Sequence, residues 1–423
     1  MPNPQYTLSS LRTRINYKIK GALSSTTQDG VINEAVRMVM SDVDLYTTKR
    51  RVMLSLNGAN AVSSEAISGT YESGDLANIV TQENKYEFHC PTDLKGKALV
   101  DIQRRVDKTE QYELTTPEEF QRRKGLYGQQ IAIDDQEFNM RRLLVSGIED
   151  ISEETIHNCD TYDGNGTWAA DTSQITATAT VTSNYVEGAG AIGFTTASGA
   201  CAGGTLTVSD MTAVDISAYE NYSVYVWIYI PMATGLTSFT LKWGSSSSAY
   251  FSRTVTANHD NTAFFIGWNL LRFPWADATE TGTVDEENVD YLQLTIIKGA
   301  TNTGTTGWII DNIRTTKDSG HDVIYYTEYG WQNSTGTYLL ESSADTDLVN
   351  ADAEGFDLIV LKASELCSEL IDDQNGVKSF KNQYDEKKSD YEMTHPSQRI
   401  VETTIYQGIQ SIDTVSNYDN TND

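Results

Sequence analysis

The residues best suited to chemistry in this chain include four carboxylates in its middle segment. They are Asp160, Asp163, Glu187 and Asp311; the first two lie in CDTYDGNGTW and the last lies in WIIDNIR. If this segment folds as a β-sandwich, its first and last strands lie side by side. Carboxylate oxygens together with backbone carbonyls are the ligands that Ca²⁺ prefers. The sequence therefore allows a structural calcium site, and it leaves open the alternative that Asp163 and Asp311 hydrogen-bond turn backbone.

Three tryptophans in the same segment are candidates for binding sugar. Trp243, Trp268 and Trp275 lie near the ends of predicted strands, where an exposed indole ring can stack on a pyranose. Packing in the core is the alternative for each ring, because large aromatic side chains usually contribute to cores.

No motif for catalysis is found in the sequence. It contains no P-loop, no H-E-x-x-H and no G-x-S-x-G, and its five histidines share no metal-ligand spacing. No motif supplies the pair of carboxylates that glycoside hydrolysis needs. We therefore predict that the protein is not an enzyme and needs no cofactor other than the Ca²⁺ considered above.

The charge of the chain limits its partners. A net charge of −28 repels phosphate groups, so we expect no sequence-specific binding of nucleic acid. No apolar run is long enough to span a membrane, and the start of the sequence does not resemble a signal peptide. The four cysteines are never spaced as C-x-x-C, which favours synthesis in a reducing cytoplasm.

The composition of the chain changes twice along its length. Six of the seven tryptophans lie between residues 159 and 316, but only five of the 31 Lys and Arg residues do. This segment reads as seven or eight short β-strands, whereas its flanks read as helices. We predict an α+β fold in which a helical domain with small β elements (1–158 and 317–399) is split by an all-β jelly-roll sandwich (159–316). Residues 400–423 follow as a C-terminal tail.

Helical periodicity is clearest near residues 8–19, 32–43, 356–370 and 377–391. Phe356, Ile359, Leu366 and Leu370 form an apolar stripe on the third of these helices. We expect this stripe to be buried by assembly of copies or partners, together with Ile400 and Ile405 of the tail. The inserted segment, by contrast, looks self-sufficient.

The middle segment resembles a carbohydrate-binding module or galactose-binding-like jelly roll. The resemblance rests on D-x-x-D-G-x-G-x-W, G-x-G-A-I-G-F, WNLLRFPW and WIIDNIR, and it covers residues 159–316. It implies the fold, and it implies a structural Ca²⁺ held by Asp160, Asp163 and Asp311.

The flanks resemble a head–tail connector (adaptor) protein of tailed bacteriophages. The similar stretches include VINEAVRMVMSDV, YEFHCPTDLKGKALVDIQRR and SFKNQYDEKKSDY. The resemblance implies a structural protein of the virion neck, in a ring of twelve copies that binds the portal protein and tail or nozzle proteins around a DNA channel. The sandwich would then project outward and bind surface glycans or anchor tail fibres. The alternative is a carbohydrate-binding adhesin or a tail-fibre attachment protein.

Overall fold

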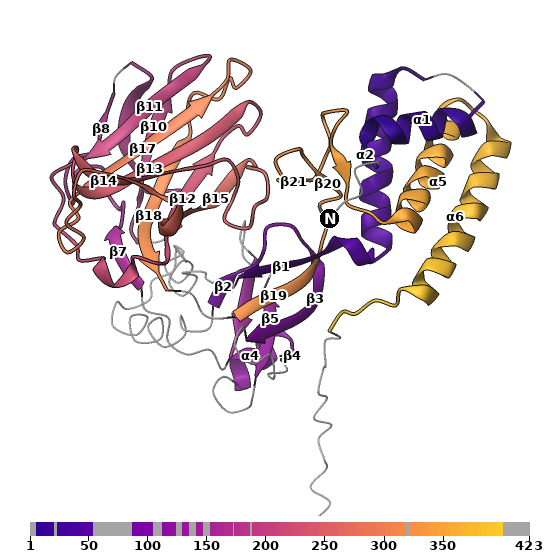
Figure 1. Ribbon diagram of the computed structural model, residues 1–423, viewed down its shortest axis with the longest axis horizontal. Helices are drawn as coiled ribbons and strands as arrows, with labels where there is room; N and C mark the ends of the chain where they lie inside the picture. The colour runs from indigo at the N-terminus through magenta and orange to yellow at the C-terminus, as the bar shows by residue number, and fades with distance from the viewer. Residues whose placement is uncertain are drawn as a thin grey trace, which may run out of the picture.

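A computed structural model describes residues 6–20, 23–53, 87–104, 112–123, 129–134, 141–146, 153–171, 173–186, 188–317 and 321–400 (Figure 1). The described residues form a helical unit, a group of small sheets and a large β-sandwich. This is an α+β fold dominated by strands. Within the described part of the chain, no helix combines the length and apolar character that crossing a membrane requires.

The helical unit contains four helices from the two ends of the chain. Side-chain caps fix where several of them begin: the Asp352 carboxylate accepts a hydrogen bond from the Gly355 amide at 2.7 Å, and the Thr7 and Ser10 side chains form a capping box. The helices are α1 (Leu8–Lys18), α2 (Ser25–Asp42), α5 (Ala353–Leu370) and α6 (Gln374–Thr394), and the small strands beside them are β20 (Trp331–Gln332), β21 (Tyr338–Leu339) and β22 (Leu348–Val349).

The predicted assembly stripe lies mostly inside this unit. Phe356 and Ile359 are buried in its core with Leu11, Ile15 and Ile32. Their expected role in contacts between subunits is therefore wrong, because the chain's own α1 and α2 cover the apolar face of α5. Leu366 packs at the margin of the same core, whereas Leu370 is exposed.

The β unit joins sequence from both sides of the sandwich. Its central strand β19, which follows the sandwich, pairs antiparallel with β1 and β3, which precede it. Segments far apart in sequence thus form one sheet. The unit contains β1 (Lys49–Met53), β2 (Glu87–His89), β3 (Leu94–Arg104), β4 (Glu113–Leu114), α4 (Pro117–Arg123), β5 (Gln130–Asp134), β6 (Arg142–Val145) and β19 (His321–Thr327).

The sandwich consists of two six-stranded sheets. We call them the β12 sheet, with order β15-β12-β18-β10-β9 and β7 on β18, and the β13 sheet, with order β16-β14-β13-β17-β11-β8. Strand β7 comes before the predicted domain start at residue 159. The strands are β7 (Glu153–His157), β8 (Ala169–Ala170), β9 (Ile175–Val181), β10 (Ala191–Thr196), β11 (Cys201–Val208), β12 (Ser223–Ile230), β13 (Leu236–Ser246), β14 (Ala249–Val255), β15 (Gly267–Pro274), β16 (Thr279–Thr281), β17 (Tyr291–Lys298) and β18 (Trp308–Thr316).

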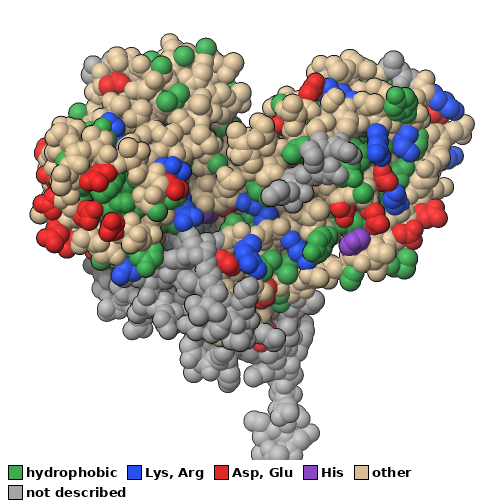
Figure 2. All heavy atoms as spheres, in the orientation of Figure 1, with side chains coloured by type: hydrophobic (Ala, Val, Ile, Leu, Met, Phe, Trp, Pro, Cys, Tyr) green, Lys and Arg blue, Asp and Glu red, His purple; other side chains and the backbone are tan. Residues whose placement is uncertain are grey.

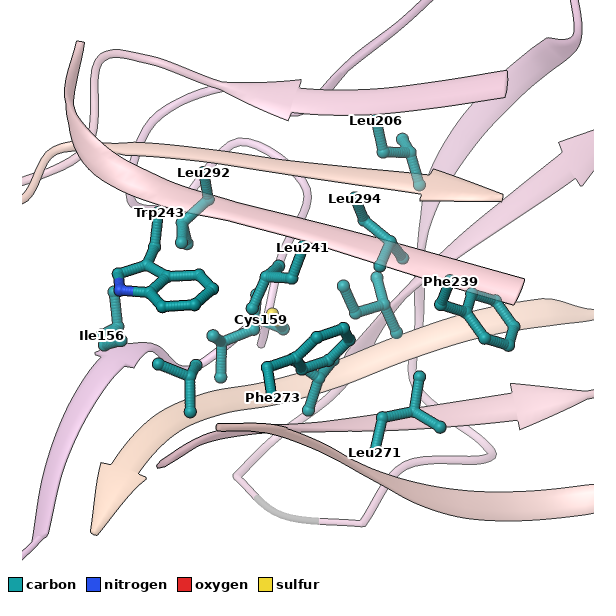
Figure 3. Close-up of a cluster of buried hydrophobic side chains, with 14 of the residues drawn as sticks. Ile156, Cys159, Leu206, Phe239, Leu241, Trp243, Leu271, Phe273, Leu292 and Leu294 are labelled. Atoms are coloured by element: carbon teal, nitrogen blue, oxygen red, sulfur yellow. The ribbon is translucent and has the colours of Figure 1, made fainter. Parts of the chain in front are cut away.

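Alternate residues of the two sheets meet in the core of the sandwich. Figure 3 shows Leu241 and Trp243 of β13 facing Leu271 and Phe273 of β15 across this core. Because side chains alternate along a strand, the residues between these point to the outer faces. The two outer faces have different surroundings, and this difference determines which residues can meet a ligand.

The outer face of the β12 sheet packs against the β unit. Its outward residues share one apolar cluster with residues of β3 and β19, among others. From the sandwich the cluster includes Tyr225, Trp227, Trp268, Leu270 and Ile309, and from the β unit it includes Leu94, Leu99, Ile102, Val323 and Tyr325. The expectation that the insert is self-sufficient and simply projects outward is therefore corrected: the outer face of β12, β15 and part of β18 is buried by the rest of the chain.

Candidate functional site

The three tryptophans predicted to stack on sugar are buried. Trp243 has no exposed surface and lies edge-on to Trp275 in the sandwich core, with ring centroids 5.9 Å apart. Trp268, 6% exposed, lies in the junction with the β unit, and its indole N–H donates to the Asn184 side-chain oxygen at 3.0 Å. The prediction is wrong for all three rings, because a position near a strand end does not decide which face a ring occupies.

Two of the predicted metal ligands hold backbone amides in place. Asp311 is fully buried and accepts hydrogen bonds from the amides of Val186 at 2.6 Å and Asn312 at 2.8 Å. The Asp160 carboxylate accepts from the Ala189 amide at 2.7 Å. Both carboxylates therefore fasten the connection between β9 and β10. For Asp311 this is the alternative that the sequence left open.

A calcium cage is not apparent in the described residues. Asp163 is exposed, and Glu187 lies outside the described residues. Within the ranges that the structure describes, no group of three or more His, Cys, Asp or Glu side chains could hold a metal ion. The nearby Cys159 thiol is buried, and this burial, with the charges of Asp311 and Asp160, raises its pKa well above the usual value. The described donors therefore do not fit Ca²⁺ by themselves.

The sequence reasoning missed a buried ionic cluster at the junction of the sandwich and the β unit. Arg50 of β1 forms an ion pair with Asp93 and donates a hydrogen bond to the backbone carbonyl of Asp260, in the sandwich loop between β14 and β15. The Tyr325 hydroxyl donates to Asp93 at 2.6 Å, and Thr327 also donates to Asp93. We call Arg50, Asp93, Asp260, Tyr325 and Thr327 the Arg50 cluster.

Hydrogen bonds hold the Asp260 carboxylate from both sides of this junction. Thr92 donates its amide at 2.8 Å and its hydroxyl at 2.6 Å, and the Thr262 hydroxyl donates at 2.6 Å. Burial alone would raise the pKa of Asp260. The charges of His259 and Arg50 and these hydrogen bonds outweigh burial and lower the pKa to about 2. The carboxylate is thus ionised at neutral pH and bridges the two parts of the chain.

Burial has the opposite net effect on Asp93. It raises the pKa of that carboxyl although Arg50 opposes the shift. The Arg50 guanidinium thus binds the Asp93 carboxylate and the backbone carbonyl of Asp260. No local motif could have revealed the cluster, since Arg50 and Asp260 are 210 residues apart.

The outer face of the β13 sheet is the candidate ligand surface. Strand register places Ser252, Lys242, Gln293 and Thr207 in one row across four strands. Lys242, Gln293 and Thr207 are partly exposed, and the Gln293 amide donates to the Thr207 hydroxyl at 2.9 Å. This row offers amine, amide and hydroxyl groups to a polar ligand.

An aromatic corner lies at the end of this row. The Lys242 amine lies 4.4 Å from the ring centroid of Tyr250, which is partly exposed, and the Tyr291 ring lies 6.2 Å from it. Hydrogen bonds with Thr281 and Lys242 lower the pKa of the Tyr250 phenol. Tyr291 is only 4% exposed and supports Tyr250 from below, so we call Tyr250, Lys242, Gln293 and Thr207 the free-face site. An aromatic ring beside a row of hydrogen-bonding groups suits an uncharged, hydroxyl-rich ligand.

Comparisons with known proteins concern about two fifths of the chain. No protein-family model and no curated protein matches this chain. Solved structures similar to it include the family 11 carbohydrate-binding module of a cellulosomal cellulase of Clostridium thermocellum, with 13% identity, 40% of this chain and 95% of that chain covered, and a TM-score of 0.27. Another is the family 30 module of a cellulase of the same organism, with 11% identity, 40% and 98% coverage and a TM-score of 0.29. At these TM-scores the similarity carries no argument about a ligand.

Proposed function

We propose that this protein is a non-catalytic carbohydrate-binding protein, an adhesin-like structural component, whose sandwich binds glycan through the free-face site. The single observation that carries the proposal is the contrast between the two outer faces of the sandwich. The β12 sheet is covered by the chain's own β unit, so the sandwich is held with its β13 sheet outward. That face bears polar groups around an aromatic corner.

The chemistry of the free-face site matches that of a saccharide. Gln293, Thr207 and Lys242 supply donors and acceptors for hydroxyl groups, and the Tyr250 ring supplies a surface for the C–H face of a pyranose. A flat site of this kind makes few contacts per copy. Tight binding to a polysaccharide would then come from several copies acting together, which can raise effective affinity by about 10²–10⁴.

A glycan array of bacterial surface polysaccharides and plant β-glucans tests the proposal with the full-length protein. We expect Tyr250→Ala and Gln293→Ala to weaken binding at least about tenfold, because each removes a contact from the centre of the site. Tyr46→Ala is the matched control, since Tyr46 is an exposed tyrosine of the helical unit. No binding by the wild-type protein, or full binding by both site variants, would contradict the proposal.

A second candidate function is the connector ring that the flanking sequences suggest. The observation that favours it is the set of exposed apolar side chains on the helical unit, which includes Tyr17, Leu370 and Met393. Such side chains suit contacts in an assembly. In this function the copies form a ring at the neck of a virion, bind the portal protein and tail proteins, and present the sandwich to glycans or fibres.

Negative-stain images of the purified protein separate these two functions. Rings with the width of a portal support the connector, whereas compact single particles contradict a ring that forms without the portal. Mixing the protein with portal particles then shows whether they bind. The glycan array is independent of this result, so each function can fail alone.

A further inference from the structure

A hollow on the helical unit has unusual chemistry for this chain. It lies between α1 and α5, has a volume of about 600 Å³, and is lined by Tyr6, Ser10, Thr13, Arg14, Tyr17, Lys18 and Phe356. The Tyr6 ring stacks on Phe356 with centroids 4.4 Å apart, and the Arg14 guanidinium lies 5.2 Å from the same ring. Tyr17 is 86% exposed at its margin. The surface is thus aromatic and open.

The charge of this hollow is opposite to that of the whole protein. Two cations and no carboxylate line it, although the chain has 59 acidic and 31 basic residues. Lys18 makes no ion pair with any residue that the structure describes. A second hollow of about 450 Å³ shares Arg14 and Lys18 and continues toward α6, but it is not basic, because Asp357, Glu386 and Asp390 line it beside Lys387. Its Asp357 carboxylate also pairs with Arg14 at 3.2 Å, so Lys18 is the cation of the first hollow that is left for an acidic ligand. We call the first hollow the α1 groove; Figure 2 shows Lys and Arg side chains on this helical lobe, with Asp and Glu side chains among them.

A basic, aromatic hollow suits a ligand with acidic groups and apolar side chains, and the C-terminal segment of this chain has both. Residues 401–423 contain four acidic residues and no Lys or Arg. They also carry Val401, Ile405, Ile409 and Ile412, spaced by three or four residues as in a single apolar stripe. Their charge and apolar spacing complement the groove.

The position of Ile400 indicates that the groove is filled from another copy. The Ile400 amide donates to the Leu99 carbonyl of β3 at 2.8 Å, and Arg399 forms an ion pair with Asp44. Figure 1 places β3 and the α1 face in separate parts of the molecule. The apolar positions begin at Val401, directly after this anchor, so the segment starts at β3 and not at the α1 face of its own copy.

We propose that residues 401–423 of one copy bind in the α1 groove of a second copy. The isoleucines pack against Tyr17 and Tyr6, and the carboxylates face Lys18 beside Arg14. A contact between an acidic segment and cationic side chains of a second copy depends on protein concentration and weakens as salt screens the charges. Reciprocal exchange closes a dimer, and exchange in one direction builds a ring or a chain.

Sedimentation velocity over a range of concentrations tests the contact. The full-length protein should self-associate, and a variant that ends at Ile400 should stay monomeric. The double variant Tyr17→Asp/Lys18→Glu should also stay monomeric, since it makes the groove polar and acidic while keeping the segment. Ile266→Asp is the control, because Ile266 is an apolar side chain that is 66% exposed on the sandwich, and it should associate like the wild type.

A mixture of the two monomeric variants gives the decisive result. The shortened variant supplies an intact groove and the groove variant supplies an intact segment, so mixing them should restore complexes that neither forms alone. A fluorescein-labelled peptide of residues 401–423 should bind the shortened variant and bind the shortened Tyr17→Asp/Lys18→Glu variant at least about tenfold more weakly.

Two outcomes would overturn the proposal. The first is no peptide binding by the shortened variant. The second is peptide binding by the shortened variant together with a full-length protein that stays monomeric and excludes the peptide, because the segment would then occupy its own groove.

Discussion

The two outer faces of the sandwich differ in the residues that they carry and in what lies against them. On strand β12 the outward residues are nearly as apolar as the inward ones, and Tyr225 and Trp227 alternate with Val224 and Val226. On the β13 sheet the outward residues are polar. A strand that is covered on both sides reads as a continuous apolar run, whereas a strand with one wet side alternates. The difference separates a face that joins the chain together from a face that is free to bind.

The largest expected effect comes from breaking the ionic contact beside the covered face. Arg50→Ala leaves the buried Asp93 carboxylate without its ion-pair partner and the Asp260 carbonyl without a donor, so we expect a loss of about 3–5 kcal/mol of unfolding free energy in urea titrations. Arg51→Ala is the matched control on the same strand. Arg51 is half-exposed and lies 3.9 Å from Asp322, so its loss should be about 1 kcal/mol or less. Equal effects would show that the Arg50 cluster does not hold the sandwich in place.

Acid should weaken the same junction in a defined window. The folded-state pKa of Asp260 is about 2, below the ordinary 3.8, so its stabilising contribution is present above about pH 4 and lost as the pH falls toward 2. The shift corresponds to about 2 kcal/mol at most. Asp93, whose pKa is raised, has the opposite dependence: its contribution is present at low pH and lost as the pH rises.

The variant Asp260→Asn isolates the Asp260 contribution. Urea unfolding at pH 6 and pH 3 should show that the wild type loses more stability on acidification than the variant does, while His259, Arg50 and Asp93 are present in both. An identical loss in the two proteins would mean that Asp260 is not held as an ionised group.

The smallest effects compare single outward positions on the central strands of the two sheets. Ile309→Val on the covered face removes one buried methylene and should cost about 1 kcal/mol. Thr295→Val on the free face keeps the shape of a partly exposed side chain and should change stability by less than about 0.5 kcal/mol. Thermal unfolding measures both changes, and a larger loss for Thr295→Val would show that the free face is covered by something.

The sequence also contains a signal that distinguishes the covered sheet from the exposed one. YSVYVWIYI, around β12, is nearly continuous in apolar residues, which indicates burial on both sides, whereas FTLKWGS in β13 alternates. Reading this contrast would have placed Trp227 in a covered face and Lys242 on a wet one. It would not have revealed the ionic cluster, since no pattern near Arg50 points to a loop between β14 and β15.

By itself the sequence determined the positions of the helices, the strand-rich middle segment and the absence of known catalytic motifs, because periodicity, caps and turns act over a few residues. Only the tertiary structure decided what covers each face. It placed Phe356 and Ile359 in the core of their own chain, buried Trp243, Trp268 and Trp275, and brought Arg50 to Asp260. Alternation along a strand says which residues share a face, but contacts between segments hundreds of residues apart decide whether that face meets water, a ligand or the protein itself.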